Sequence, residues 1–71
     1  MHERITITVD RGVADVRLVR ADKMNALDER MFDALVEAGD ALARDSAVRC
    51  VVLSGEGKAF CAGIDMAALA D

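Results

Sequence analysis

The chain contains no tryptophan, no tyrosine and no proline, and only two phenylalanines, two cysteines and one histidine among its 71 residues. Because aromatic residues are so few, the core has to be built from Val, Leu, Ile, Ala and Met. Two cysteines make no disulfide framework, and one histidine without a C-x-x-C pair leaves too few ligands for a zinc site. We therefore expect reduced thiols in the cytoplasm and no bound metal.

Long apolar runs and an excess of basic charge are also missing. No apolar stretch reaches the roughly 18 residues that a membrane span needs, and no apolar run follows a basic start at the N-terminus. The net charge is −4, from nine Lys and Arg against thirteen Asp and Glu. These features argue against a membrane and against nucleic acid as partners.

Apolar residues are plentiful, at 54% of the chain, which is high for a soluble domain. A chain of this length buries only about 60% of its unfolded surface, and it is marginally stable without disulfides, a bound metal or oligomerisation. Many of these apolar residues are therefore expected to need cover from more chain or from a partner.

Two strand-like runs lie near the N-terminus. Residues 5–9 alternate apolar residues with threonine, and residues 13–19 form a second β-prone run with Val16 and Leu18 on one face. Gly12 between the runs can supply the positive φ of a tight turn, so we expect an antiparallel hairpin. Residues 20–27 show no strand period and are predicted to form a loop.

A helix is expected over residues 28 to about 44. Asp28 is predicted to be its N-cap, because its carboxylate can accept hydrogen bonds from N–H groups of the first turn. Apolar residues at helical spacing predict a single buried stripe. The stripe comprises Met31, Phe32, Leu35, Val36, Ala38 and Leu42.

A third strand is expected at residues 48–53. Its uninterrupted run Cys-Val-Val-Leu predicts burial on both faces, Cys50 included, as in a parallel sheet. A strand–helix–strand connection places this strand parallel to residues 13–19. A loop follows, and Asp65 is suited to cap a last short helix. The pattern predicts an α/β fold.

The glycine-rich stretch "SGEGKAFCAG" at residues 54–63 invites a test for phosphate binding. A P-loop needs G-x-x-x-x-G-K-[ST], but Val52 occupies the first glycine position and Ala59 follows Lys58. A dinucleotide fingerprint would need glycine in place of Phe60. Both phosphate-binding motifs are therefore excluded.

Side-chain chemistry in "FCAGID" has little support. Cys61 has no evident general base, since the only histidine is His2 near the terminus, and packing is its simpler role. Asp65 has a structural task as a helix cap. The backbone offers more, because Gly63 can take an unusual φ and leave the N–H of Ile64 without an acceptor in the chain. Such a donor can stabilise an anion or a polarised oxygen.

Three segments together carry a family resemblance. "KAFCAGIDMAAL" at residues 58–69 closely resembles the first oxyanion-hole segment of the enoyl-CoA hydratase/isomerase family, the crotonases. "RADKMNAL" at residues 20–27 resembles the loop before that family's first helix, with Asn25-Ala26-Leu27 as its typical core. "VRCVVLSGEGKAF" at residues 48–60 is similar to the strand and loop that lead into the oxyanion-hole segment.

The resemblance implies a crotonase-like spiral of ββα units, of which residues 1–71 are the N-terminal portion: hairpin, helix, parallel strand and short helix. It also implies that the 71 residues are a truncated part of a single domain. The substrates would be acyl-CoA thioesters of fatty acid metabolism, with coenzyme A as part of the substrate and no separate cofactor. The assembly would be a homo-oligomer, a trimer or a hexamer.

The resemblance also implies roles for individual residues. The amide of Ile64 would donate to the thioester carbonyl, and Ala62 and Ile64 match backbone positions near the CoA adenine. Lys23 and Met24 match the loop that runs along the CoA phosphates and ribose. Asn25 is expected to be structural and to hold the turn before the helix.

The family pattern continues with a second oxyanion N–H from a glycine-rich segment and with acidic catalytic residues, and residues 1–71 contain neither. We therefore expect the 71-residue chain to be inactive alone, as part of an enzyme that hydrates an enoyl-CoA or moves its double bond. One alternative is a non-catalytic CoA-binding or assembly fragment. Another is a generic βα unit that binds anions without preferring acyl-CoA.

Overall fold

The computed structural model describes residues 3–69, and it begins with a β-hairpin. Strand β1 (Ile5–Asp10) pairs antiparallel with β2 (Val13–Leu18). Arg11 and Gly12 form the turn, with φ of 52° and 82°. Two positive φ values are typical of the type I′ turn, whose twist suits a two-residue hairpin. The predicted hairpin is confirmed, and Arg11 shares the left-handed conformation with Gly12. His2 lies outside the described residues.

Helix α1 (Glu29–Ala43) follows the hairpin through a short 3₁₀ turn, η1 (Ala21–Lys23). Asp28 has extended backbone angles, and its Oδ1 accepts a hydrogen bond of 2.9 Å from the amide of Met31. This bond satisfies one of the first-turn N–H groups that have no partner inside the helix. The predicted N-cap is confirmed, whereas the predicted loop contains a turn of 3₁₀ helix.

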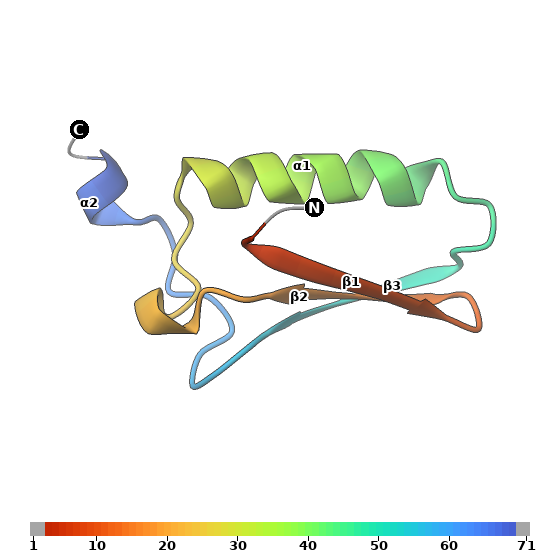
Figure 1. Ribbon diagram of the computed structural model, residues 1–71, viewed down its shortest axis with the longest axis horizontal. Helices are drawn as coiled ribbons and strands as arrows, with labels where there is room; N and C mark the ends of the chain where they lie inside the picture. The colour runs from red at the N-terminus through yellow and green to blue at the C-terminus, as the bar shows by residue number, and fades with distance from the viewer. Residues whose placement is uncertain (1–2, 70–71) are drawn as a thin grey trace.

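Strand β3 (Cys50–Gly55) pairs with β2 in parallel, which gives the sheet order β1-β2-β3. The register runs from Val13 opposite Cys50 to Leu18 opposite Gly55, so the predicted parallel placement is confirmed. Figure 1 shows α1 lying along one face of the sheet. The short helix α2 (Met66–Leu69) lies beyond the end at which β2 and β3 finish.

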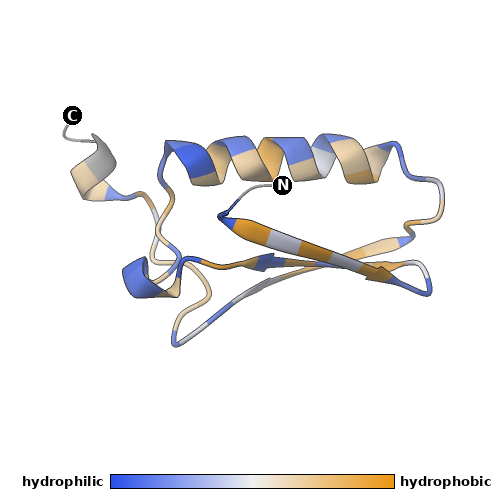
Figure 2. Cartoon of the chain, viewed as in Figure 1, coloured by the Kyte–Doolittle hydropathy of each residue, from blue (hydrophilic) through white to orange (hydrophobic). Residues whose placement is uncertain are grey.

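The core lies between α1 and the sheet face that α1 covers. Strand β1 alternates apolar residues with threonine, as the orange and pale bands of Figure 2 show, so one side of the strand is apolar. Leu35 and Leu42 of α1 are partly buried against the core. The buried apolar residues are Ile5, Ala14, Val16, Leu18, Met31, Ala34 and Ala38.

The predicted helix stripe is correct only in part. Met31 and Ala38 are buried, but Phe32 and Val36 are exposed, Val36 to 64%. A residue one position further along a helix is turned by about 100°, so Phe32 and Val36 lie beside the stripe instead of on it. The sheet lies under only one side of α1, and Ala34 occupies an inward position that was not predicted.

The prediction that β3 is buried on both faces is wrong. Residues 50–53 are all exposed, including Cys50, which was expected to be buried. The physical reason is that β3 lies at one edge of the sheet, where α1 leaves it uncovered. A groove of about 620 Å³ separates α1 from β3, and Leu35, Leu42, Val51 and Leu53 contribute to its lining.

Residues 3–69 include no helix with the length and apolar character needed to cross a bilayer. The same residues hold no group of three or more His, Cys, Asp or Glu side chains placed to bind a metal ion. Cys50 and Cys61 are both free thiols.

Candidate functional site

The candidate site lies at the end of the sheet where β2 and β3 finish. Parallel strands end at the same edge, so the chain after β2 and the chain after β3 meet there. The first of these loops, residues 19–28, leads into α1, and the second, residues 56–65, leads into α2 (Figure 1).

Asn25 holds the two loops together. Its side chain is fully buried, and its Oδ1 accepts a 2.8 Å hydrogen bond from the amide of Arg20. Its Nδ2 donates to three carbonyl oxygens of the second loop, those of Glu56 and Ala59 at 2.9 Å and of Phe60 at 3.1 Å. A side-chain amide supplies an acceptor and two donors in one group. The structural role expected of Asn25 is confirmed.

Backbone hydrogen bonds join the loops further along. The amide of Ala62 donates to the carbonyl of Met24 at 2.9 Å, and the amide of Leu27 donates to the carbonyl of Gly63 at 2.7 Å. The amide of Asp65 donates to the carbonyl of Leu27 at 2.9 Å. Leu27 therefore pairs with both neighbours of residue 64, which makes an isolated parallel bridge.

The geometry of this bridge leaves the amide of Ile64 unused. In a parallel bridge, Leu27 bonds to the residues before and after its partner, and the partner's own N–H and C=O point to the opposite side. Among residues 3–69, no hydrogen bond is donated by the Ile64 amide. Gly63 has φ of 96°, and a Cβ built there would meet no atom within 4 Å. Backbone conformation, and not lack of room, therefore favours glycine at this position.

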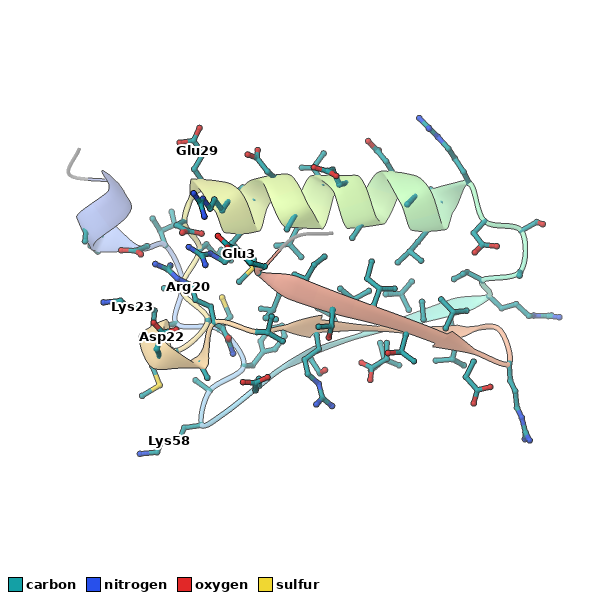
Figure 3. All side chains as sticks on the ribbon, viewed as in Figure 1. Glu3, Arg20, Asp22, Lys23, Glu29 and Lys58 are labelled. Atoms are coloured by element: carbon teal, nitrogen blue, oxygen red, sulfur yellow. The ribbon has the colours of Figure 1, made fainter. Side chains whose placement is uncertain are left out.

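The structure brings the four predicted site residues to one edge. Lys23 ends η1, and Met24 follows in the left-handed conformation with its side chain exposed. The bond from Ala62 to Met24 places both beside Ile64. Figure 3 shows Lys23 at the end of the molecule where the loops meet. Their binding and catalytic roles remain predictions.

An ion pair at this edge was not predicted from the sequence. The Nη1 of Arg20 lies 2.8 Å from Oδ2 of Asp65 and donates to the carbonyl of Ala26 at 3.0 Å. The Oδ1 of Asp65 accepts from the amide of Ala67 at 3.0 Å. Asp65 is therefore the predicted cap of α2 and also the partner of Arg20. The two residues are 45 positions apart, so no local spacing signals the pair.

Arg20 also connects Asp65 to the start of α1. Its Nη2 lies 3.6 Å from Oδ2 of Asp28, and the same oxygen lies 2.8 Å from Nη2 of Arg4. Arg4, Asp28, Arg20 and Asp65 thus form a network of alternating charge, called here the Arg–Asp network. Figure 3 shows Arg20 between the start of α1 and the loop that leads to α2.

The network changes the acidity of Asp28. Its pKa is lowered from 3.8 to about 2, first because Arg4 donates hydrogen bonds to the carboxylate. Burial opposes this change, whereas the hydrogen bond from the Met31 amide and the charge of Arg20 add to it. The same hydrogen bond raises the pKa of Arg4. Asp28 is therefore a stable anion at neutral pH.

Comparison with known proteins places this chain in a family. A family model described as enoyl-CoA hydratase/isomerase matches residues 13–71. The chain belongs to the enoyl-CoA hydratase/isomerase family. The resemblance described from the three sequence segments is confirmed.

Solved structures of enoyl-CoA hydratases share this fold. One from Mycobacterium marinum superposes with a TM-score of 0.91 at 34% identity, over 94% of this chain and 32% of that chain. One from Mycobacterium tuberculosis H37Rv superposes with a TM-score of 0.92 at 31% identity, over 96% of this chain and 31% of that chain. The predicted α/β fold, an N-terminal portion of the crotonase fold, is confirmed.

Curated relatives include isomerases. The chain is 36% identical over 66 residues to a 1,2-epoxyphenylacetyl-CoA isomerase of Escherichia coli (strain K12), which is 93% of this chain and 25% of the relative. It is 39% identical over 66 residues to a mitochondrial Delta(3,5)-Delta(2,4)-dienoyl-CoA isomerase of Mus musculus, which is 92% of this chain and 20% of the relative. The chain therefore spans a quarter or less of the length of these relatives.

Proposed function

We propose that this chain supplies the first oxyanion-hole donor of an enzyme that hydrates an enoyl-CoA thioester or shifts its double bond. The observation that carries the proposal is the Ile64 amide, which the parallel bridge turns away from Leu27 and which donates no hydrogen bond within residues 3–69. The names of the relatives, a hydratase and isomerases of CoA thioesters, support the substrate class.

The proposed role follows from the charge that such a reaction develops. Removing a proton next to a thioester, or adding water across its double bond, transfers negative charge to the carbonyl oxygen. A fixed N–H stabilises that charge without moving, whereas water would have to reorient. Ile64 meets this requirement because hydrogen bonds of its two neighbours fix the backbone on either side of it.

The residues around Ile64 suit the coenzyme portion of such a substrate. Lys23 is an exposed ammonium that can approach the CoA phosphates, and the exposed Met24 offers an apolar surface beside it. We assign the backbone at Ala62 and Ile64 to the CoA adenine, as the family resemblance implies. The same resemblance supports a homotrimer or a hexamer as the assembly.

The carboxylates near Ile64 are already engaged, which favours a second candidate function for the 71 residues alone. Asp65 is bonded to Arg20 and to the amide of Ala67, and Asp28 is bonded to Arg4. Neither is positioned as a general acid or base. The chain alone would then be a CoA-binding or assembly fragment, and retention of CoA without turnover of crotonyl-CoA or 3-enoyl-CoA would support this candidate.

The test of the catalytic role is a chimera in which residues 1–71 replace the matching segment of the E. coli isomerase. The relative then supplies the remaining parts of its own site. Ile64→Pro deletes the donor, and we expect kcat to fall by about 10²–10³-fold. Ile64→Val keeps the amide and is the matched control, with kcat expected to stay close to that of the unmodified chimera.

A second form of the test removes the N–H with less disturbance. Proline also restricts Gly63, so an ester in place of the amide at residue 64, introduced by chemical ligation, isolates the loss of the donor. We expect the same fall in kcat for the ester. Full kcat in a folded ester chimera would overturn the proposal.

A further inference from the structure

The residue next to the proposed donor carries a negative charge. Asp65 follows Ile64 directly, and the developing charge on a bound carbonyl oxygen is also negative. An uncompensated carboxylate on the adjacent residue lowers the electrostatic potential at the Ile64 amide and opposes oxyanion stabilisation. A site built on the Ile64 amide therefore needs something to offset Asp65.

Arg20 is placed to offset this charge. Its Nη1 is 2.8 Å from Oδ2 of Asp65, and the side chains are only 12% and 14% exposed. A pair so poorly accessible to water is screened less than a surface ion pair. The other carboxylate oxygen accepts from the amide of Ala67. One oxygen of Asp65 thus accepts from Arg20, and the other caps the start of α2.

Arg20 is itself held in place. Its guanidinium donates to the carbonyl of Ala26, its Nη2 approaches Asp28, and its backbone amide donates to Asn25. A planar guanidinium with several fixed acceptors loses little freedom when it pairs with a carboxylate. The charge opposite Asp65 is therefore part of the folded loop.

We propose that Arg20 is a positioning residue that neutralises Asp65 and holds it on the cap of α2, so that the Ile64 amide keeps the positive potential an oxyanion donor needs. This inference rests on the proposed function of Ile64. It adds a residue that does not touch the substrate and a reason for an aspartate beside an oxyanion donor.

Hydrogen exchange tests the electrostatic part without any substrate. The Ile64 amide makes no hydrogen bond in the described residues, so it exchanges directly from the folded state. Hydroxide, the catalyst of exchange, is attracted by positive and repelled by negative potential. In Arg20→Met the Ile64 exchange is expected to slow by about 3- to 10-fold, whereas in Asp65→Asn it is expected to accelerate.

The opposite changes in exchange rate expected for the two variants distinguish an electrostatic effect from a loss of structure. Loss of structure would move exchange in the same direction for both variants, because each loses the same ion pair. Asn still offers an acceptor to the amide of Ala67, so Asp65→Asn preserves the helix cap. Equal exchange rates in the parent chain, Arg20→Met and Asp65→Asn would overturn the inference.

Kinetics of the chimera test the catalytic consequence. Arg20→Met is expected to lower kcat by about 10-fold with a smaller change in KM, because the carbonyl oxygen gains charge only in the transition state. Arg20→Met combined with Asp65→Asn is expected to recover most of that loss, since no carboxylate then needs to be offset. Arg20→Lys retains the charge and is expected to lie between the parent and Arg20→Met.

Arg4→Met is the matched control. Arg4 has the same short contact to a carboxylate, 2.8 Å to Asp28, and it also lies near Glu3. Its loss is expected to reduce stability and to leave kcat within about 2-fold. A loss of kcat in Arg20→Met that Asp65→Asn does not reverse would overturn the inference.

The outcomes also separate this inference from the proposed function. If the ester at residue 64 leaves kcat unchanged while the exchange rates shift as expected, the oxyanion role fails and the electrostatic role of Arg20 stands. If the ester lowers kcat but the charge variants show no coupling in kcat or in exchange, the oxyanion role stands and the role of Arg20 fails.

Discussion

Four residues of the two loops at the candidate site have positive φ: Met24 at 52°, Asn25 at 57°, Gly57 at 87° and Gly63 at 96°. Asparagine and glycine tolerate this region, but methionine adopts it at a cost. The contacts of the buried Asn25 side chain with both loops hold this stretch in place. Single residues therefore shape the backbone here, and the proposed chemistry depends on that shape.

Two glycines offer a test of this backbone argument. Gly63→Ala is expected to destabilise the chain by about 1–2 kcal/mol, because φ of 96° strains an alanine although space is open around it. Gly39→Ala is the matched control, since Gly39 lies inside α1 and also has open space. It is expected to stabilise by about 0.5–1 kcal/mol. Urea denaturation measures both, and two changes of the same sign would contradict the argument.

At the scale of elements, the start of α1 is tied to the rest of the molecule by charge. Asp28 caps the helix through the Met31 amide and joins it to β1 through Arg4, which precedes that strand. Arg20 extends the connection to the loop before α2. The Arg–Asp network thus connects β1, the start of α1 and the loop before α2.

The lowered pKa of Asp28 predicts an acid-sensitive helix start. The folded state favours the carboxylate, so the stabilisation is fully present above pH about 4 and is lost as pH falls towards about 2. We expect the free energy of unfolding, measured with urea across this range, to decrease. Asp28→Asn keeps a capping acceptor but cannot titrate, so its stability is expected to change less over the same range. An equal decrease in both proteins would contradict the assignment to Asp28.

At the scale of the whole molecule, the exposed edge at β3 is the dominant feature. The described residues form an elongated body of 40 × 23 × 17 Å with α1 covering only part of the sheet. Residues 50–53 are uncharged and exposed, and the groove beside them is apolar. An exposed, uncharged edge strand is a template for pairing with another chain.

We therefore expect the 71-residue chain to self-associate through β3. Val51→Lys puts a charge in the middle of the edge strand, where Val51 is 50% exposed, and is expected to shift the chain towards monomer in sedimentation velocity. Val36→Lys is the matched control, because Val36 is also exposed but lies on α1 away from the groove lining. A monomeric parent chain, or equal effects of the two lysines, would refute the prediction.

Much of the candidate site could be located from the sequence. The segments 20–27 and 58–69 marked Lys23, Met24, Ala62 and Ile64 through the family motif, and the structure brings them to one edge. The motif did not indicate that Arg20 and Asp65 form an ion pair. That contact joins residues 45 positions apart, and neither residue carries a local signal of the other.

The hairpin, the cap and span of α1 and the parallel strand could all be predicted from the residues alone. These signals are local: alternation with threonine, a glycine at the turn, and an aspartate at the helix start. The sequence also indicated that Gly63 could leave the Ile64 amide without an acceptor, and residues 3–69 contain none for it. The exposure of β3, Phe32 and Val36 became evident only in the folded structure. Burial and strand pairing depend on which surfaces of the fold come into contact. A run of apolar residues does not indicate whether another element covers it.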